Sequence, residues 1–196
     1  MKQFLTNLFN KASNSRGISI IEVLIAGLIT GIIATSSFSF YVSMQQQSET
    51  QYEVSELQHT CRTSLWDMKK TLRLAGFKIG SHVPYEISAD TLAVYYNDTQ
   101  PVDSFRYFLQ EFDSFEYSLV PNLPDGRQLY KLMKQINSAP AAVYAEYITK
   151  ISYNVIDPSN IVITIQAQTT KQDDTYTPNG GFREFSLAER VHLRNL

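Results

Sequence analysis

The sequence predicts an α+β protein, with one long N-terminal helix followed by an antiparallel β-sheet head. The first observation is an apolar run of about 25 residues, 18–42, that carries one charge, Glu22. The second is a stripe of apolar residues that continues at helical spacing to Ala75. The third is a change after Phe77 to short β-branched and aromatic runs separated by turns. We expect four segments along the chain: 1–17, 18–42, 43–76 and 77–196.

Residues 1–17 are expected to form a basic leader in front of the apolar run. They carry Lys2, Lys11 and Arg16 and no acid, as expected for the cytoplasmic flank of a first membrane segment. An ordinary signal peptide has an apolar core of about 7 to 15 residues and is cleaved behind that core. Here the apolar run is longer, and the candidate processing point, Gly17, lies in front of it.

The apolar run 18–42 is long enough for a membrane-spanning helix. Such a helix would measure roughly 37 Å, and the hydrocarbon core of a bilayer is about 30 Å thick. A carboxylate inside it costs on the order of 2.5 to 3.5 kcal/mol, so Glu22 needs a partner or a function. Two interpretations stay open. Ser19 and Glu22 have the spacing of a capping box at a helix start, or the carboxylate pairs with a positive charge of another subunit.

The hexapeptide GISIIE at 17–22 resembles the cleavage and methylation site of type IV prepilins. That family usually has Phe and Thr after the glycine, where this chain has Ile18 and Ser19. The resemblance implies that a prepilin peptidase cuts between Gly17 and Ile18 and methylates the new N-terminus of Ile18. Glu22 would then be the fifth residue of the mature chain, whose carboxylate pairs with the N-terminal ammonium of a neighbouring subunit during assembly.

Residues 43–76 are expected to continue the helix, to about Ala75, as an amphipathic segment. Seven residues recur at spacings of three and four and share one face: Val54, Leu57, Cys61, Leu65, Met68, Leu72 and Ala75. Because Cys61 lies on this face, we expect a core residue rather than a nucleophile. It is the only cysteine, so no internal disulfide can form. Gly76 is expected at the C-terminal cap of the helix.

The segment LWDMKKTLRLAGF at 65–77 looks like the end of the long helix in PilW-like minor pilins, and it is also similar to J-type minor pseudopilins. The resemblance implies a structural subunit of a type IV pilus, not an enzyme, with no cofactor. It would cross the inner membrane once with a periplasmic head, and then enter an extracellular filament. Its partners would be other pilin subunits, the prepilin peptidase and the inner-membrane assembly platform. A pseudopilin of type II secretion and a signal-anchored periplasmic binding or enzymatic domain stay open as alternatives.

The head is expected to contain several short strands joined by turns. The candidate strands are 91–96, 105–109, 115–120, 128–135, 148–156, 161–168 and 182–193. The turn 157–160, Asp-Pro-Ser-Asn, predicts a hairpin between the two strands that flank it. Strands in this order, packed on one helix, make an antiparallel α+β head.

Charge and motif content leave little support for other chemistry. The net charge is −2, so there is no basic field to recruit nucleic acid. The three histidines, His59, His82 and His192, are far apart and form no metal-binding motif. Asp173 and Asp174 are adjacent acids that could help to hold Ca²⁺, but two acids are weak support, and we expect a solvated loop there.

Overall fold

The computed structural model describes residues 18–80, 83–97, 103–113, 126, 128–173 and 176–195. The expected α+β class is confirmed, because a long N-terminal helix, α2, is followed by one antiparallel sheet. The chain divides into two compact units, Met1–Ser48 and Glu49–Leu196. The leader 1–17 and the strand expected at 115–120 lie outside the described residues.

Helix α2 (Ile20–Leu72) starts two residues later than expected. Its first turn is closed by a capping box. The backbone N–H of Ile21 donates to Oγ of Ser19 at 3.3 Å, and the N–H of Ser19 donates to the carboxylate of Glu22 at 3.0 Å. The side chains of Ser19 and Glu22 thus accept hydrogen bonds from N–H groups that a helix start leaves without partners.

The C-terminal end of α2 differs from the expected cap at Gly76. The helix ends at Leu72, because the N–H groups of Leu74 and Ala75 donate to carbonyls three residues back, at 2.9 and 3.0 Å. Gly76 lies beyond this tighter turn with φ +80°. A Cβ added there would overlap the backbone carbonyl of Asn195. The absence of a Cβ at Gly76 therefore allows the backbone of Asn195 to lie against the C-terminal end of α2.

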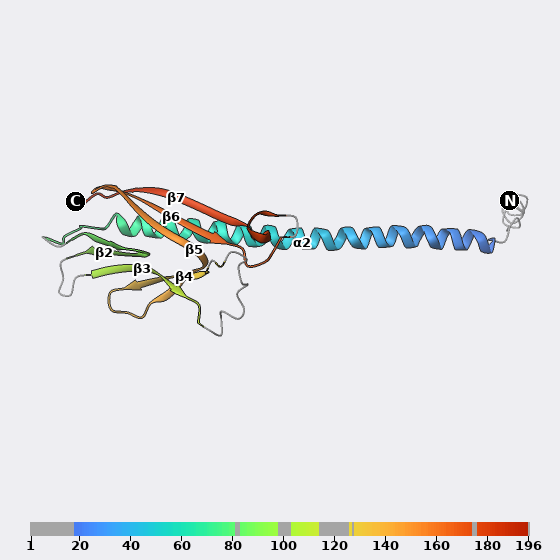
Figure 1. The fold of residues 1–196 in the computed structure, drawn as a ribbon, viewed down its shortest axis with the longest axis horizontal. Helices are drawn as coiled ribbons and strands as arrows, with labels where there is room; N and C mark the ends of the chain where they lie inside the picture. The colour runs from blue at the N-terminus through green and yellow to red at the C-terminus, as the bar shows by residue number, and fades with distance from the viewer. Residues whose placement is uncertain are drawn as a thin grey trace, which may run out of the picture. The chain divides into compact units, whose positions relative to one another are not determined.

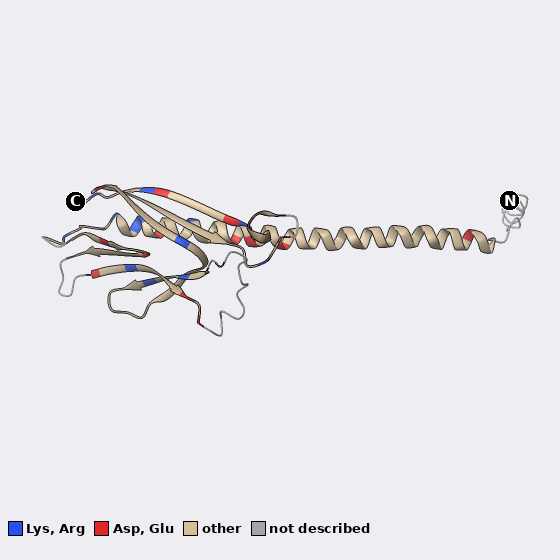
Figure 2. Cartoon of the chain, viewed as in Figure 1, with Lys and Arg blue, Asp and Glu red and all other residues tan. Residues whose placement is uncertain are grey.

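The part of α2 in the first unit is apolar and exposed. Its large hydrophobic side chains from Ile20 to Tyr41 are between 50% and 81% exposed. Figure 2 shows this part of the ribbon almost free of charged residues. By length and composition the helix can cross a membrane, with a mean hydropathy of 2.0 over its most apolar window. A continuous apolar surface of this size marks contact with lipid or with other protein.

In the described part of the second unit, seven strands pair in chain order into one antiparallel sheet. They are β1 (Tyr85–Ser88), β2 (Thr91–Tyr96), β3 (Asp103–Glu111), β4 (Tyr130–Ile136), β5 (Ala142–Asp157), β6 (Asn160–Gln168) and β7 (Glu184–His192). A short 3-10 helix, η1 (Pro178–Gly181), precedes β7. The hairpin predicted around 157–160 is confirmed, since Asp157 pairs with Asn160. Strand β1 was not predicted, and β5 begins six residues before its expected start.

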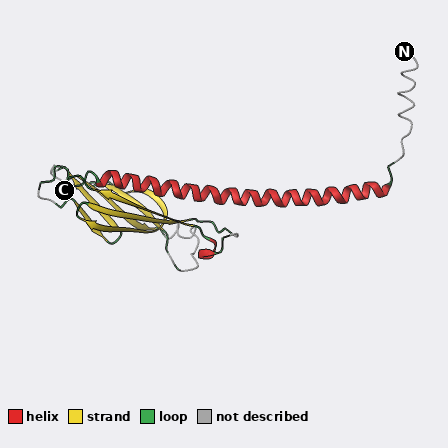
Figure 3. Ribbon diagram, turned by 90° about the horizontal axis from the view of Figure 1, so that it is seen from above, coloured by secondary structure: helices red, strands yellow, loops and turns green. Residues whose placement is uncertain are grey.

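The main core lies between the C-terminal part of α2 and the sheet. The predicted stripe is confirmed for six of its seven members, which are at most 7% exposed, and Val54 is half-buried. The six are Leu57, Cys61, Leu65, Met68, Leu72 and Ala75. These side chains share one cluster with residues of β2–β7. Figure 1 shows β7 above this part of α2 and β2–β4 below it, with β5 and β6 crossing it in this view, and β2–β7 all contribute to the core cluster. Figure 3 shows the strands alongside the same part of the helix.

One polar cluster links α2 to the sheet. Asp67 on α2 accepts hydrogen bonds from the hydroxyl of Tyr107 at 2.6 Å and from Nζ of Lys134 at 2.5 Å. Nζ of Lys134 lies 5.3 to 5.5 Å from the centroids of three aromatic rings on β3 and β5. Burial, and then the nearby Asp67, raise the pKa of Tyr144 to about 12. The ion pair is 18% exposed on both sides, so removing one partner would leave a largely buried charge.

Candidate functional site

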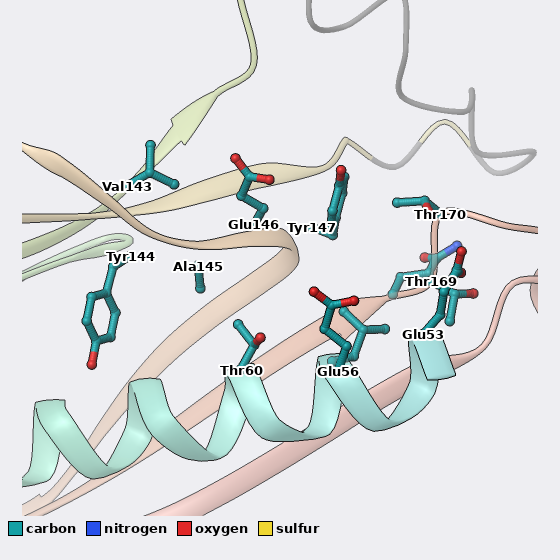
Figure 4. Close-up of a pocket in the computed structure, with 12 residues that line it drawn as sticks. Glu53, Glu56, Thr60, Val143, Tyr144, Ala145, Glu146, Tyr147, Thr169 and Thr170 are labelled. Carbon is teal, nitrogen blue, oxygen red and sulfur yellow. The ribbon is translucent and has the colours of Figure 1, made fainter. Parts of the chain in front are cut away.

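A cavity of about 470 Å³ opens between α2 and β5, entirely within the second unit. Its lining comes from α2 between Glu53 and Thr60, from residues 143–147 of β5, and from residues 168–170 at the end of β6. Figure 4 shows Glu53, Glu56 and Thr60 rising from α2 toward β5, while Ala145 points back toward the helix. Small-molecule sites in proteins typically occupy about 300 to 1,000 Å³, and this cavity falls in that range.

The cavity lining is acidic. Three of its twelve residues are glutamates, Glu53, Glu56 and Glu146, and none is a lysine, arginine or histidine. Lys171 lies outside the lining, with Nζ 3.7 Å from the lining residue Glu53 and 3.2 Å from Glu49, which does not line the cavity. The hydrogen bond to Glu49, and then the charges of Glu49 and Glu53, raise the pKa of Lys171. Glu56 and Glu146 form no ion pair with any residue that the structure describes.

Tyr147 occupies an unusual backbone position in the cavity lining. Its φ is +61°, in the left-handed region that bulky residues rarely adopt, next to a register shift between β4 and β5. Its ring stacks on Phe112 at 5.8 Å between centroids. Burial, and then the charges of Glu146, Glu53 and Glu56, raise the pKa of its hydroxyl. Backbone strain of this kind is concentrated at sites of function.

Gln168 lines the cavity at the end of β6 and is fully buried, at 0% exposure. Neither its Nε2 nor its Oε1 has a hydrogen-bond partner among the described residues. Leaving a buried donor or acceptor unpaired costs about 1 to 3 kcal/mol, so such groups are rare in folded proteins. Both polar atoms of this amide are closed to solvent as well, so the amide destabilises the free chain.

No protein-family model, no curated protein and no solved structure matches the chain. The α+β class is established by the structure itself.

The residues of the predicted processing motif belong to the first unit. Gly17 lies outside the described residues, and Ile18 is 76% exposed. Glu22 caps its own helix through Oε2, so the capping interpretation is confirmed for the single chain. A pairing between subunits involves a second chain and stays a prediction.

The expectation of a solvated loop is wrong at Asp173. This residue is only 9% exposed, and its Oδ2 accepts a hydrogen bond from Nε of Arg183 at 2.7 Å. The carboxylate is therefore buried in an ion pair whose arginine side chain is 42% exposed. Asp174 lies outside the described residues, and within the described ranges no group of three or more His, Cys, Asp or Glu is placed to hold a metal ion.

The sequence alone did not predict the cavity, because its acids are dispersed along the chain. Glu53 and Glu56 lie outside the apolar stripe of α2, and Glu146 lies on a strand whose start was not predicted. One signal was available in β6. Alternation places Ile165 and Ala167 inward and Gln168 outward, yet Gln168 is buried as well.

Proposed function

We propose that this chain is a minor pilin, a structural subunit of a type IV pilus that acts in pilus assembly. In this proposal a prepilin peptidase cuts after Gly17 and methylates Ile18, and the subunit passes from the inner membrane into an extracellular filament. The observation that carries the proposal is the exposed apolar stretch of α2, which follows the GISIIE motif and holds one charge, Glu22. Soluble domains rarely expose a continuous apolar surface of this size. A subunit that moves from lipid into a filament core buries it in both places.

In the proposed filament, Glu22 neutralises the N-terminal ammonium of an adjacent subunit. In the single chain its Oε2 accepts the N–H of Ser19, and Oε1 has no hydrogen bond to a described residue. Breaking a buried ion pair by removing one partner costs about 3 to 5 kcal/mol. A cost of this size favours the axial register in which each carboxylate meets an ammonium. The partners are other pilin subunits and the inner-membrane assembly platform.

The mass of the mature protein tests the processing step. Protein recovered from cells with an active prepilin peptidase should lack residues 1–17 and carry one methyl group on Ile18. A Gly17→Val variant serves as the control and should keep its leader. An N-terminus at Met1 in the unsubstituted chain would contradict the proposal.

Substitutions at the helix start separate the two roles of the Glu22 carboxylate. Glu22→Gln keeps an oxygen acceptor for the N–H of Ser19 but loses the charge, whereas Ser19→Ala loses the hydroxyl cap and keeps the charge. We expect all variants to be processed. Recovery in sheared filaments should fall for Glu22→Gln and Glu22→Ala and stay normal for Ser19→Ala. If recovery in filaments falls for Ser19→Ala and stays normal for Glu22→Gln, capping of its own helix is the role of Glu22.

The acidic cavity favours a second candidate, a periplasmic binding domain held by an uncleaved signal anchor. That candidate requires the leader to stay attached, so the same mass measurement separates it from a pilin. A pseudopilin of type II secretion shares the processing step. It is distinguished by a secretion defect, in place of a loss of pili, when the gene is deleted.

A further inference from the structure

We propose that the outer edge of β7 binds an extended acidic segment of another protein, which adds a further antiparallel strand to the sheet beside a basic stripe on α2. Every residue in this proposal belongs to the unit Glu49–Leu196. The proposal therefore does not depend on the assignment as a pilin, and it applies equally to an anchored binding domain.

The outer edge of β7 offers backbone hydrogen-bonding groups to a further strand. Among the described strands, β7 pairs with β6 alone. The carbonyl of Arg183 and the N–H of Leu193 lie just before and just after β7, and they bond to residues that flank β6, at 2.9 and 2.8 Å. Hydrogen-bonded positions alternate along an antiparallel ladder, so the even-numbered residues of β7 direct their N–H and C=O groups outward. Four of them have no partner for these groups among the described residues: Ser186, Ala188, Arg190 and His192.

The two edges of the described sheet differ in their protection against pairing with other chains. Natural edge strands are commonly short, or carry prolines, lysines or bulges. β1 is four residues long and directly follows Pro84. β7 runs for nine residues without a proline or a lysine, and its register with β6 is unbroken. An edge of this kind is a template for strand addition.

A basic stripe on α2 lies beside this edge. Four residues at spacings of four, three and four share one side of the helix: Arg62, Trp66, Lys69 and Arg73. Lys69 forms an ion pair with Glu189 of β7, which places this side of α2 against β7. Trp66 is 62% exposed, and Arg62 and Arg73 are exposed as well. Neither arginine has an ion pair with a described residue.

The charge around this stripe selects an acidic partner. Between residues 59 and 78 no exposed residue is an Asp or a Glu, and the half-buried Asp67 is already paired with Lys134. Side chains of an added strand alternate between the two faces of the sheet, and the strand would lie about 4.8 Å beyond β7. Alternate side chains therefore face the stripe, where carboxylates would meet Arg62 and Arg73. A basic segment would be repelled there.

The fluorescence of Trp66, the only tryptophan, measures binding to the full-length chain in detergent micelles. The probe is the acetylated and amidated peptide TETEVET, whose glutamates share one face of a strand. We expect saturable binding with a shift of the emission. The neutral peptide TQTQVQT should bind at least about tenfold more weakly. N-methylation of the middle Thr and of the Val in TETEVET removes N–H groups that would face β7, and it should abolish binding.

The peptide series separates strand addition from simple charge attraction. No saturable binding of TETEVET would overturn the proposal. Equal binding of the neutral peptide would remove the role of the basic stripe, and equal binding of the N-methylated peptide would remove the role of the strand edge. Either result would also overturn it.

Three variants of the full-length chain locate the binding edge. Ala188→Pro removes an N–H that faces outward and leaves the bonds to β6 in place, and it should weaken binding at least about tenfold. Arg62→Gln should weaken binding at least about fivefold. Arg106→Gln makes the same charge change at an exposed position on β3 and should bind normally. Unchanged affinity in Ala188→Pro or Arg62→Gln, or an equal loss in Arg106→Gln, would overturn the assignment.

Two further measurements complete the test. Cys61 is buried, so its protection from a thiol reagent shows that Ala188→Pro keeps its fold. If this variant does not fold, the N-methylated peptide decides the backbone contact. A second copy of the chain could also pair at this edge. The full-length chain would then be dimeric in micelles, Ala188→Pro would be monomeric and TETEVET would not bind, a combination that would overturn the proposal.

Discussion

Replacing Gln168 by methionine should make the free protein more stable. The side chain is fully buried, and both polar atoms of its amide lack partners among the described residues. Methionine has a similar length and volume and no group that needs a hydrogen bond. The substitution therefore removes a desolvated amide and keeps the packing around the end of β6.

The size of the effect follows from two opposing contributions. Removing an unpaired buried polar group gains about 1 to 3 kcal/mol. Exchanging one buried side chain for another of similar volume costs less than about 1.5 kcal/mol. We expect the free energy of unfolding to rise by about 1 kcal/mol, which would lower the open fraction of the second unit roughly fivefold.

Cys61 provides the measurement. It is the only cysteine in the chain and is 0% exposed in the core between α2 and the sheet. Its labelling by a thiol reagent in increasing urea therefore reports opening of the second unit. Gln166→Met is the matched control, because the same substitution is made two residues away at an exposed position. That control should change the free energy of unfolding by less than about 0.5 kcal/mol.

One result would refute this reasoning. If Gln168→Met opens more readily than the unsubstituted chain while Gln166→Met does not, the amide supports the fold. The amide of Gln168 would then contribute a stabilising interaction to the folded second unit.

Three further predictions concern the second unit. Asp67→Asn should lower the free energy of unfolding by about 3 kcal/mol, because Lys134 loses its counter-charge in a site that is 18% exposed. A loss below about 1 kcal/mol in urea denaturation would show that solvent replaces the carboxylate. Gly76→Ala should cost at least about 2 kcal/mol, since the residue has φ +80° and its Cβ would overlap Asn195, and an unchanged Tm would contradict this. Burial raises the pKa of Cys61 from 9.0 to about 11, so its contribution to stability is complete below pH 9 and is lost as pH rises toward 11. In Cys61→Ala, the free energy of unfolding measured by urea denaturation should depend less on pH between 9 and 11.

The sequence predicted those parts of the fold that depend on local periodicity. The stripe from Leu57 to Ala75 identified the buried face of α2, because a helical repeat of apolar residues has one favourable arrangement against a sheet. The hairpin at 157–160 followed from its turn residues. Both features are set by neighbours in the chain.

Other features depend on contacts between distant residues, and the sequence did not predict them. β1 is only four residues long and forms by pairing with β2, so its own residues carry little signal. α2 was expected to reach Ala75, but it stops at Leu72, and Gly76 beyond it is approached by Asn195 from the other end of the sequence. The cavity likewise needs the register shift at β5 and the end of β6.

The approach of Asn195 to the end of α2 has a consequence for synthesis. Its side-chain Nδ2 donates to the carbonyl of Arg73 at 3.0 Å, so the last residues of the chain complete a helix that was translated long before them. Until the ribosome releases β7 and these residues, the apolar face of α2 lacks part of its cover. The second unit therefore cannot complete its core until β7 has been synthesised, however early α2 leaves the ribosome.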